Sequence, residues 1–158
     1  MKIRMSIVLI VTHLFVGGVG FLVGIYALPI LTAPTAPAAE ELAVISANAQ
    51  YRTEFKKNLK GSDLLHWGEG QVFLSPSFIT LKGTLAPGPN YMLYLSPTFV
   101  ETEDDFNRLK ARMISVGDVR TFNNFVVKVP PNIDLSQYNS LIIWCEAFGE
   151  FITSAKYR

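Results

Sequence analysis

The first part of the chain is one unbroken apolar run. From Met5 to Leu28 the sequence contains no charged residue, and at ~1.5 Å of helical rise per residue the run is long enough to cross a hydrocarbon core of ~30 Å. The apolar region of a cleaved signal peptide is shorter, usually ~7–15 residues. An Ala-x-Ala pattern at Ala36 to Ala38 offers a cleavage signal, but it lies well beyond the run. The pattern therefore favours an uncleaved transmembrane helix, or signal anchor, over residues 5–28.

The charges that flank this run predict its orientation. Lys2 and Arg4 precede it, and no further cation occurs before Arg52. Because cytoplasmic flanks carry the excess of Lys and Arg, residues 1–4 are predicted to be cytoplasmic and the rest of the chain after the span extracytoplasmic, in the cell envelope. The sequence thus predicts a single-pass membrane protein.

Two different patterns follow the apolar run. Residues 29–39 contain Pro29, Pro34 and Pro37, which interrupt helices and favour an extended spacer. Residues 40–60 place apolar side chains near a 3.6-residue period, with acidic residues first, lysines last and a glycine at the end. We therefore expect a linker over 29–39 and an amphipathic helix over 40–60 that docks on the following domain or on a partner.

Residues 61–158 alternate short apolar strands with turns. The strand candidates are rich in aromatic and β-branched residues: "LLHWGEGQVFLS", "FITLKGTLA", "YMLYLS", "FVVKVP" and "LIIWCEAF". One helix is expected in "TEDDFNRLKARMI", with Thr102 as its cap and Phe106, Leu109 and Met113 on one side. These patterns predict a mainly β domain, an antiparallel β-sandwich or small barrel with one short helix.

Charge and composition exclude several functions. Setting aside Lys2 and Arg4, 12 basic residues face 13 acidic ones, a formal charge of −1, so no basic field exists to hold nucleic acid. One cysteine and two histidines are too few for a structural zinc site. The acidic cluster of residues 101–105 lacks the alternating ligands and glycine of a calcium loop, which favours a solvated helix start. No phosphate loop or complete active site is present, so the sequence gives no basis to assign an enzymatic activity.

Two features of the apolar run stand out against its hydrocarbon character. His13 is polar at membrane depth and has no acidic partner in the span, which favours a tolerated neutral imidazole over a functional group. Gly17, Gly20 and Gly24 lie mostly on one helical side, and such a face allows self-association of two helices. Glycine is also simply common in membrane helices, and this second interpretation is favoured.

The main candidates for chemistry are Cys145 and His66. Free cysteine is among the most buried residue types, and strand alternation places Leu141, Ile143 and Cys145 on one face, which is typical of a core. An extracytoplasmic thiol with no partner in its own chain is otherwise a reactive group, a cofactor ligand or an intermolecular bridge. Packing is favoured for Cys145 on these grounds. A satisfied polar group early in a strand is favoured for His66.

In the stretch from about Leu65 to Tyr157, "HWGEG" has the pattern H-x-x-x-G, "GTLAPGPNYMLYLS" places a turn between two strands, and "YNSLIIWCEAFGEFITSA" ends the stretch and includes Cys145. These three motifs resemble the opening, the turn and the closing motif of the DM-thirteen domain, a family described as an electron-transfer module. Two departures occur: Asn90 replaces the usual aspartate, and the glycine expected ahead of the "FVVKVP" strand is absent near Asn123 and Asn124.

The resemblance implies a redox function that rests on the cysteine. Cys145 would act as a bare thiol or as the ligand of a prosthetic group such as haem, with His66 as an accessory ligand or base. A second hypothesis is a binding or adhesion module with a structural cysteine, in which the loops "APGPN" and "SPTFVETEDD" meet a partner. A third is a scaffold subunit that recruits another membrane protein through the glycine face of its span.

Overall fold

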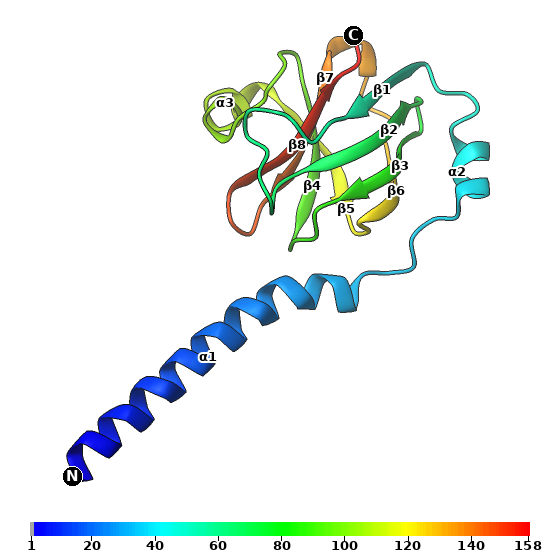
Figure 1. The fold of residues 1–158 in the computed structure, drawn as a ribbon. Helices are drawn as coiled ribbons and strands as arrows, with labels where there is room; N and C mark the ends of the chain where they lie inside the picture. The colour runs from blue at the N-terminus through cyan, green and yellow to red at the C-terminus, as the bar shows by residue number, and fades with distance from the viewer. Residues whose placement is uncertain (1) are drawn as a thin grey trace.

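The computed structural model describes residues 2–158, and within them eight strands form two antiparallel sheets of four strands each. The strands are β1 (Tyr51–Phe55), β2 (Gly68–Leu74), β3 (Phe78–Leu85), β4 (Tyr91–Ser96), β5 (Ile114–Val119), β6 (Asn123–Lys128), β7 (Ser140–Cys145) and β8 (Glu150–Lys156). The helices are α1 (Lys2–Thr32), α2 (Ala39–Ile45) and α3 (Glu103–Leu109), with short 3-10 turns η1 (Lys110–Arg112) and η2 (Leu135–Gln137). Figure 1 shows the long helix α1 running away from a compact β domain.

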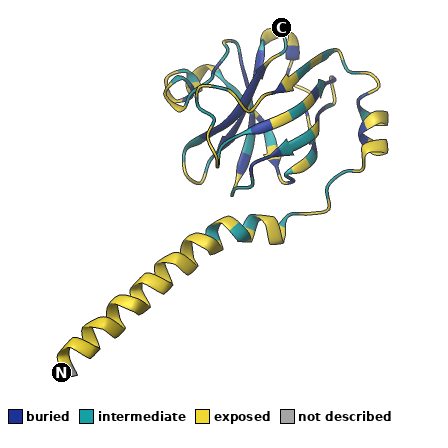
Figure 2. Ribbon diagram, in the orientation of Figure 1, coloured by how far each residue is buried: buried dark blue, intermediate teal, exposed yellow. Residues whose placement is uncertain are grey.

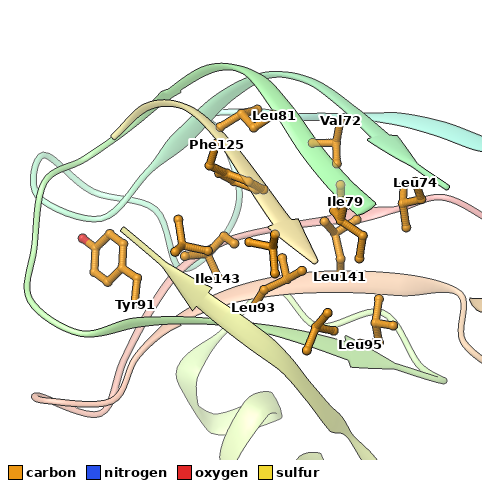
Figure 3. Close-up of a cluster of buried hydrophobic side chains, with 14 of the residues drawn as sticks. Val72, Leu74, Ile79, Leu81, Tyr91, Leu93, Leu95, Phe125, Leu141 and Ile143 are labelled. Carbon is orange, nitrogen blue, oxygen red and sulfur yellow. The ribbon is translucent and has the colours of Figure 1, made fainter. Parts of the chain in front are cut away.

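The two sheets pack face to face as a β-sandwich. One has the strand order β1-β2-β3-β6 and the other β5-β4-β7-β8. Alternate side chains from both sheets, among them Leu81, Leu93, Phe125 and Leu141, fill the space between them (Figure 3). The predicted mainly β fold with a short helix is confirmed, and the sandwich replaces the barrel alternative.

Strand β7 is the central element, because both of its faces are covered and all six of its residues are buried. Leu141, Ile143 and Cys145 point between the sheets, as the alternation predicted. Ile142 and Trp144 point the other way, into a second apolar cluster beneath α3. The five expected strands are present, whereas β1, β5 and β8 were not recognised as strands.

Helix α3 carries the predicted cap and apolar face. The Thr102 hydroxyl accepts a hydrogen bond from the backbone N–H of Asp105 at 3.2 Å, so the helix begins where the sequence predicted. Phe106 is buried, and Leu109 and Met113 pack beside it at the edge of the second cluster. The regular helix ends at Leu109 and continues only as the 3-10 turn η1.

Helix α1 is longer than the predicted 5–28 span. It is long and apolar enough to cross a membrane, and almost all of its large apolar side chains are exposed (Figure 2). The predicted linker over 29–39 is wrong in its first part, because Pro29 lies inside the helix, which ends at Thr32. Pro29 lacks the backbone N–H for one helical hydrogen bond, and only three more residues of helix follow it. The Thr32 hydroxyl adds a bond to the Leu28 carbonyl at 2.8 Å.

The predicted amphipathic helix over 40–60 is also wrong over most of its length. The helix ends at Ile45, and residues 51–55 form strand β1. Tyr51 and Phe55 fit a two-residue as well as a helical spacing, and pairing with β2 satisfies the backbone along the whole strand. The short helix α2 does dock on the domain, where Leu42 is buried and the Ser46 hydroxyl bonds that of Thr80 at 2.7 Å.

Left-handed backbone explains two features of the family resemblance. Gly70, the last residue of "HWGEG", has φ +132°, and a Cβ there would collide with backbone of Lys82 and Gly83 on the paired strand. Asn124 has φ +58° and stands near the missing glycine; asparagine tolerates this region better than most residues. Its side chain also donates to the Pro37 carbonyl at 3.0 Å, which ties the linker to the domain.

Candidate functional site: a cavity between α1 and the sandwich

Cys145 is the last residue of β7 and lies where the core meets the end of the sandwich. In the sheet register it stands opposite Tyr91 of β4 on one side and Glu150 of β8 on the other. The residue is 2% exposed and belongs to the core cluster. The predicted packing role is therefore consistent with its position, but the core ends at this residue.

The sulfur of Cys145 is held by backbone groups from two turns. Its thiol donates to the Pro89 carbonyl at 3.1 Å. The backbone amides of Phe148 and Ala147, in the turn that follows β7, are directed at the sulfur. Burial raises the pKa of the thiol, and the two amides oppose part of this rise because they favour the thiolate. The net direction is upward, so the protonated thiol is the favoured form.

The turn "APGPN" folds over the thiol. The Tyr91 hydroxyl donates to the Ala86 carbonyl at 2.9 Å, which closes the turn on itself. Asn90 has φ +54°, a conformation that asparagine tolerates, and its carbonyl accepts from the backbone N–H of Glu146 at 3.0 Å. Residues 86–90 and 146–149 are thereby joined directly above Cys145.

His66 lies in the loop before β2, not within a strand as the sequence indicated. Its Nδ1 bonds the Asp63 carboxylate at 2.9 Å, and the side chain is 25% exposed. Because an ionised carboxylate only accepts, Nδ1 carries the proton and Nε2 remains for a ligand. The other carboxylate oxygen accepts the backbone N–H groups of Leu65 and His66 at 2.7 and 2.8 Å. These bonds, the imidazole first, lower the pKa of Asp63.

Cys145 and His66 line the same cavity, which has a volume of about 630 Å³. One wall is the last part of α1, between Leu22 and Ile30, and the other is formed by the loops at this end of the sandwich. Polar groups are few among the lining residues: Tyr26, His66, Tyr91, Cys145 and Glu150. A mostly apolar pocket of this size with a few convergent polar groups is typical of a site for a small molecule or cofactor.

The sequence identified two residues of this site and missed three others. Asp63 precedes His66 by three residues, a spacing at which an aspartate closes a turn and reaches the next side chain, so it was recognisable in principle. Tyr91 was hidden because only the register of β4 and β7 places it opposite Cys145. Tyr26 was assigned to the span, and nothing local indicates that its helix forms a wall of the cavity.

Two of the four acidic residues at 101–105 form ion pairs. Glu101 bonds Lys60 at 3.2 Å, and Asp105 bonds Arg108. Within residues 2–158, no group of three or more His, Cys, Asp or Glu side chains is placed to hold a metal ion. The loops "APGPN" and "SPTFVETEDD" precede and follow β4 and so lie at opposite ends of one strand.

His13 and the three glycines are the residues of α1 that the sequence singled out. His13 Nδ1 is 2.7 Å from the Leu9 carbonyl, which gives the imidazole a partner within its own helix. A Cβ on Gly17, Gly20 or Gly24 would meet nothing within 4 Å. Self-association through this glycine face stays a prediction.

Comparison with known proteins supports the resemblance drawn from the sequence. The model of the family described as Electron transfer DM13 matches residues 54–157, which include Asp63, His66 and Cys145. A search of curated proteins and a search of solved structures each found no match to the chain.

Proposed function

This chain belongs to the Electron transfer DM13 family, and we propose that it is a membrane-anchored electron-transfer module whose redox site is the cavity between α1 and the sandwich. The observation that carries this proposal is that Cys145 and His66, from different parts of the domain, line one largely apolar cavity. The family match supports a redox role in general, and the cavity is large enough to hold a redox group beside Cys145.

The proposed anchor is helix α1. Its length and apolar surface suit a single crossing of a bilayer. Lys2 and Arg4 favour a cytoplasmic amino terminus, which would put the sandwich on the extracytoplasmic side. In that compartment a thiol without a partner in its own chain is unusual and has to be protected or used.

The proposed redox group is Cys145, acting as a thiol or as the ligand of a prosthetic group such as haem. The cavity volume lies within the range of ligand pockets, and the sulfur lines it. The amides of Ala147 and Phe148 would support a thiolate, and hydrogen bonds of this kind tune the potential of a sulfur-ligated centre. His66, fixed by Asp63, would present Nε2 as an accessory ligand or base. A bound haem would supply one-electron chemistry.

The test uses the full chain in lipid nanodiscs. Haemin is titrated in, and the visible spectrum is recorded for the native chain, Cys145→Ala and His66→Ala. We expect a Soret band that shifts or disappears in Cys145→Ala and a smaller change in His66→Ala. Cys145→Ser is the matched control, because it keeps a donor to the Pro89 carbonyl but removes the sulfur. Absence of a band, together with a thiol that does not react with alkylating agents in the folded state, would overturn the redox proposal.

A second candidate is a binding module in which Cys145 only fills space. The observation that favours it is the burial of the residue in the core cluster and the bond that its thiol already makes to Pro89. In that case Cys145→Ser would bind every partner as the native chain does, and haemin would give the same spectrum with both.

A further inference from the structure

The β domain exposes a few large apolar side chains, and most of them lie at one end. Among residues 33–158 of the described chain, the exposed large hydrophobic residues are Val44, Leu64, Leu65 and Phe148. Leu64 is 93% exposed, Leu65 54% and Phe148 57%. Single exposed apolar residues are ordinary on a protein surface. Three on adjoining loops need a reason.

These three residues lie on the side of the sandwich that faces α1. Leu65 and Phe148 line the cavity together with Leu22 and Ile30 of the helix. Leu64 adjoins Leu65 on a loop that Asp63 holds in a fixed turn. Figure 1 shows the turn between β7 and β8 next to the last part of α1, whereas α2, which carries Val44, lies well away from it. We call residues 62–67, 86–90 and 146–149 the loop face.

We propose that the loop face rests in the lipid leaflet at the carboxyl end of α1, with Leu64, Leu65 and Phe148 inserted at the level of the headgroups. The proposal relies on the membrane crossing of α1 proposed above. The helix residues beside the loop face, 22–30, are those at the end of the predicted span, so the loops lie at the depth of the membrane interface. Tyr26 is half-exposed at the same level, where aromatic residues are enriched in membrane proteins.

We call this contact of the loop face with the leaflet the membrane seat. It relies on apolar side chains rather than on charge. The ionisable groups within the loop face are Asp63, His66 and Glu146, two of them acidic, while the neighbouring Lys57 lies over the Trp67 ring and Lys110 pairs with Glu146. A surface that bound anionic lipids by electrostatic attraction would instead carry Lys and Arg. The seat is therefore expected to form equally well on zwitterionic and anionic bilayers, and to persist at high salt.

The seat determines how the cavity is filled. With the loop face in the leaflet, the cavity that holds Cys145 and His66 opens between α1 and the loops towards lipid rather than water. Its lining is apolar apart from the five polar residues named above. If Cys145 acts as a bare thiol, the ligand class that fits is a small apolar molecule dissolved in the bilayer, with one polar group to meet His66 or Cys145.

The test is site-directed spin labelling, which is simple here because the chain has a single cysteine. Replacing Cys145 with Ala leaves a cysteine-free chain, into which one cysteine at a time is introduced and spin-labelled. The test positions are Leu64→Cys and Phe148→Cys. Leu14→Cys is the reference within the span, Ser136→Cys the aqueous reference, and Val44→Cys the matched control for an exposed apolar residue elsewhere. The full chain is studied in phosphatidylcholine nanodiscs, and collision with oxygen is compared with collision with a water-soluble nickel chelate.

We expect the oxygen-to-nickel ratio at residues 64 and 148 to be severalfold higher than at residues 44 and 136, and highest at residue 14. If residue 14 has the ratio of an aqueous site, the membrane crossing itself is wrong. If residue 14 is in lipid while residues 64 and 148 match residue 136, the crossing stands and the seat is wrong. A high ratio at residues 64 and 148 that appears only when phosphatidylserine is added to the phosphatidylcholine discs would contradict the apolar mechanism.

The route to the cavity is tested on the native thiol. A lipid-soluble maleimide should label Cys145 severalfold faster than a charged, membrane-impermeant one of similar intrinsic reactivity. Phe148→Asp should reduce this preference, because a charge on the loop face favours water at the cavity mouth. Phe148→Leu is the conservative control and should retain it. Equal labelling by both reagents in the native chain would show that the cavity opens to water.

Discussion

Trp144 and Cys145 are neighbours on β7, yet they are closed off by different parts of the molecule. The indole of Trp144 stacks on Phe106 of α3, with ring centroids 3.8 Å apart and planes 9° from parallel. Trp144 is therefore covered by a helix of the β domain itself. Cys145 meets a cavity whose far wall is α1, a helix outside the sandwich. A side chain closed off by its own domain is committed to stability, whereas one closed off by a separate helix can be exposed to a ligand.

Removing the stacked indole should be the most damaging change. Trp144→Ala deletes a large buried ring and leaves Phe106 without its stacking partner, so we expect a loss of ~3–5 kcal/mol in the free energy of unfolding. The measurement is denaturant unfolding of the full chain, followed by tryptophan fluorescence, to which Trp67 of the β domain contributes in the native chain and in the variant. Leu64→Ala is the control, since its exposed side chain should change stability by at most ~0.5 kcal/mol.

A much smaller loss is expected one residue further along. Cys145→Ala removes one buried atom beside an existing cavity, so no large new void forms, and we expect a cost of ~1 kcal/mol. The same unfolding experiment measures it. A loss as large as that of Trp144→Ala would mean that Cys145 is closed core and that the comparison between the two residues fails.

The sequence predicted the part of the fold that repeats a simple period. Alternation in "LIIWCEAF" identified β7, and Thr102 marked the start of α3. The sequence did not predict β1, because Tyr51 and Phe55 fit both a helical and a strand period. Only pairing with β2 decides between the two. The helix at Pro29 was missed because proline disfavours a helix beyond its first turn, and local rules do not show that α1 continues to Thr32.

The candidate site was less accessible to sequence analysis. Cys145 and His66 were found by their residue types and by the family motif. The cavity was not, because its walls come from α1, the "APGPN" turn and the β7–β8 turn, which are far apart in the chain. The exposed apolar residues Leu64 and Phe148 also look like strand or core residues until the fold shows them on loops.

The reactivity of Cys145 should depend on pH in a way that reports its burial. Burial raises the pKa of the thiol, so less thiolate is present at neutral pH than for a free cysteine, whose pKa is ~8.5. We expect alkylation by a small uncharged reagent to be severalfold slower than that of a free thiol at pH 8 and to increase at higher pH than the free thiol. The profile is measured by quenching the alkylation after fixed times at several pH values and determining the alkylated fraction by mass spectrometry. A profile shifted to lower pH would show that the amides of Ala147 and Phe148 outweigh burial.

The smallest effect on stability, but the most informative about the site, is expected for Asp63→Asn. Asp63 is mostly exposed, so the change in unfolding free energy should stay within ~0.5 kcal/mol. The asparagine amide that replaces the carboxylate oxygen can donate, which favours the His66 tautomer with the proton on Nε2 rather than Nδ1. Nitrogen NMR shifts of His66 would report this exchange, with His13 as the internal control.

In the native chain, the lowered pKa of Asp63 means that its stabilising bonds are present above the usual pKa of the carboxyl, near 4, and are lost only as the pH falls through the lower folded value. The amide signals of Leu65 and His66 should therefore shift in that acidic range, and the shift should be absent in Asp63→Asn. An unchanged His66 tautomer in the variant would mean that Asp63 does not set the nitrogen presented to the cavity.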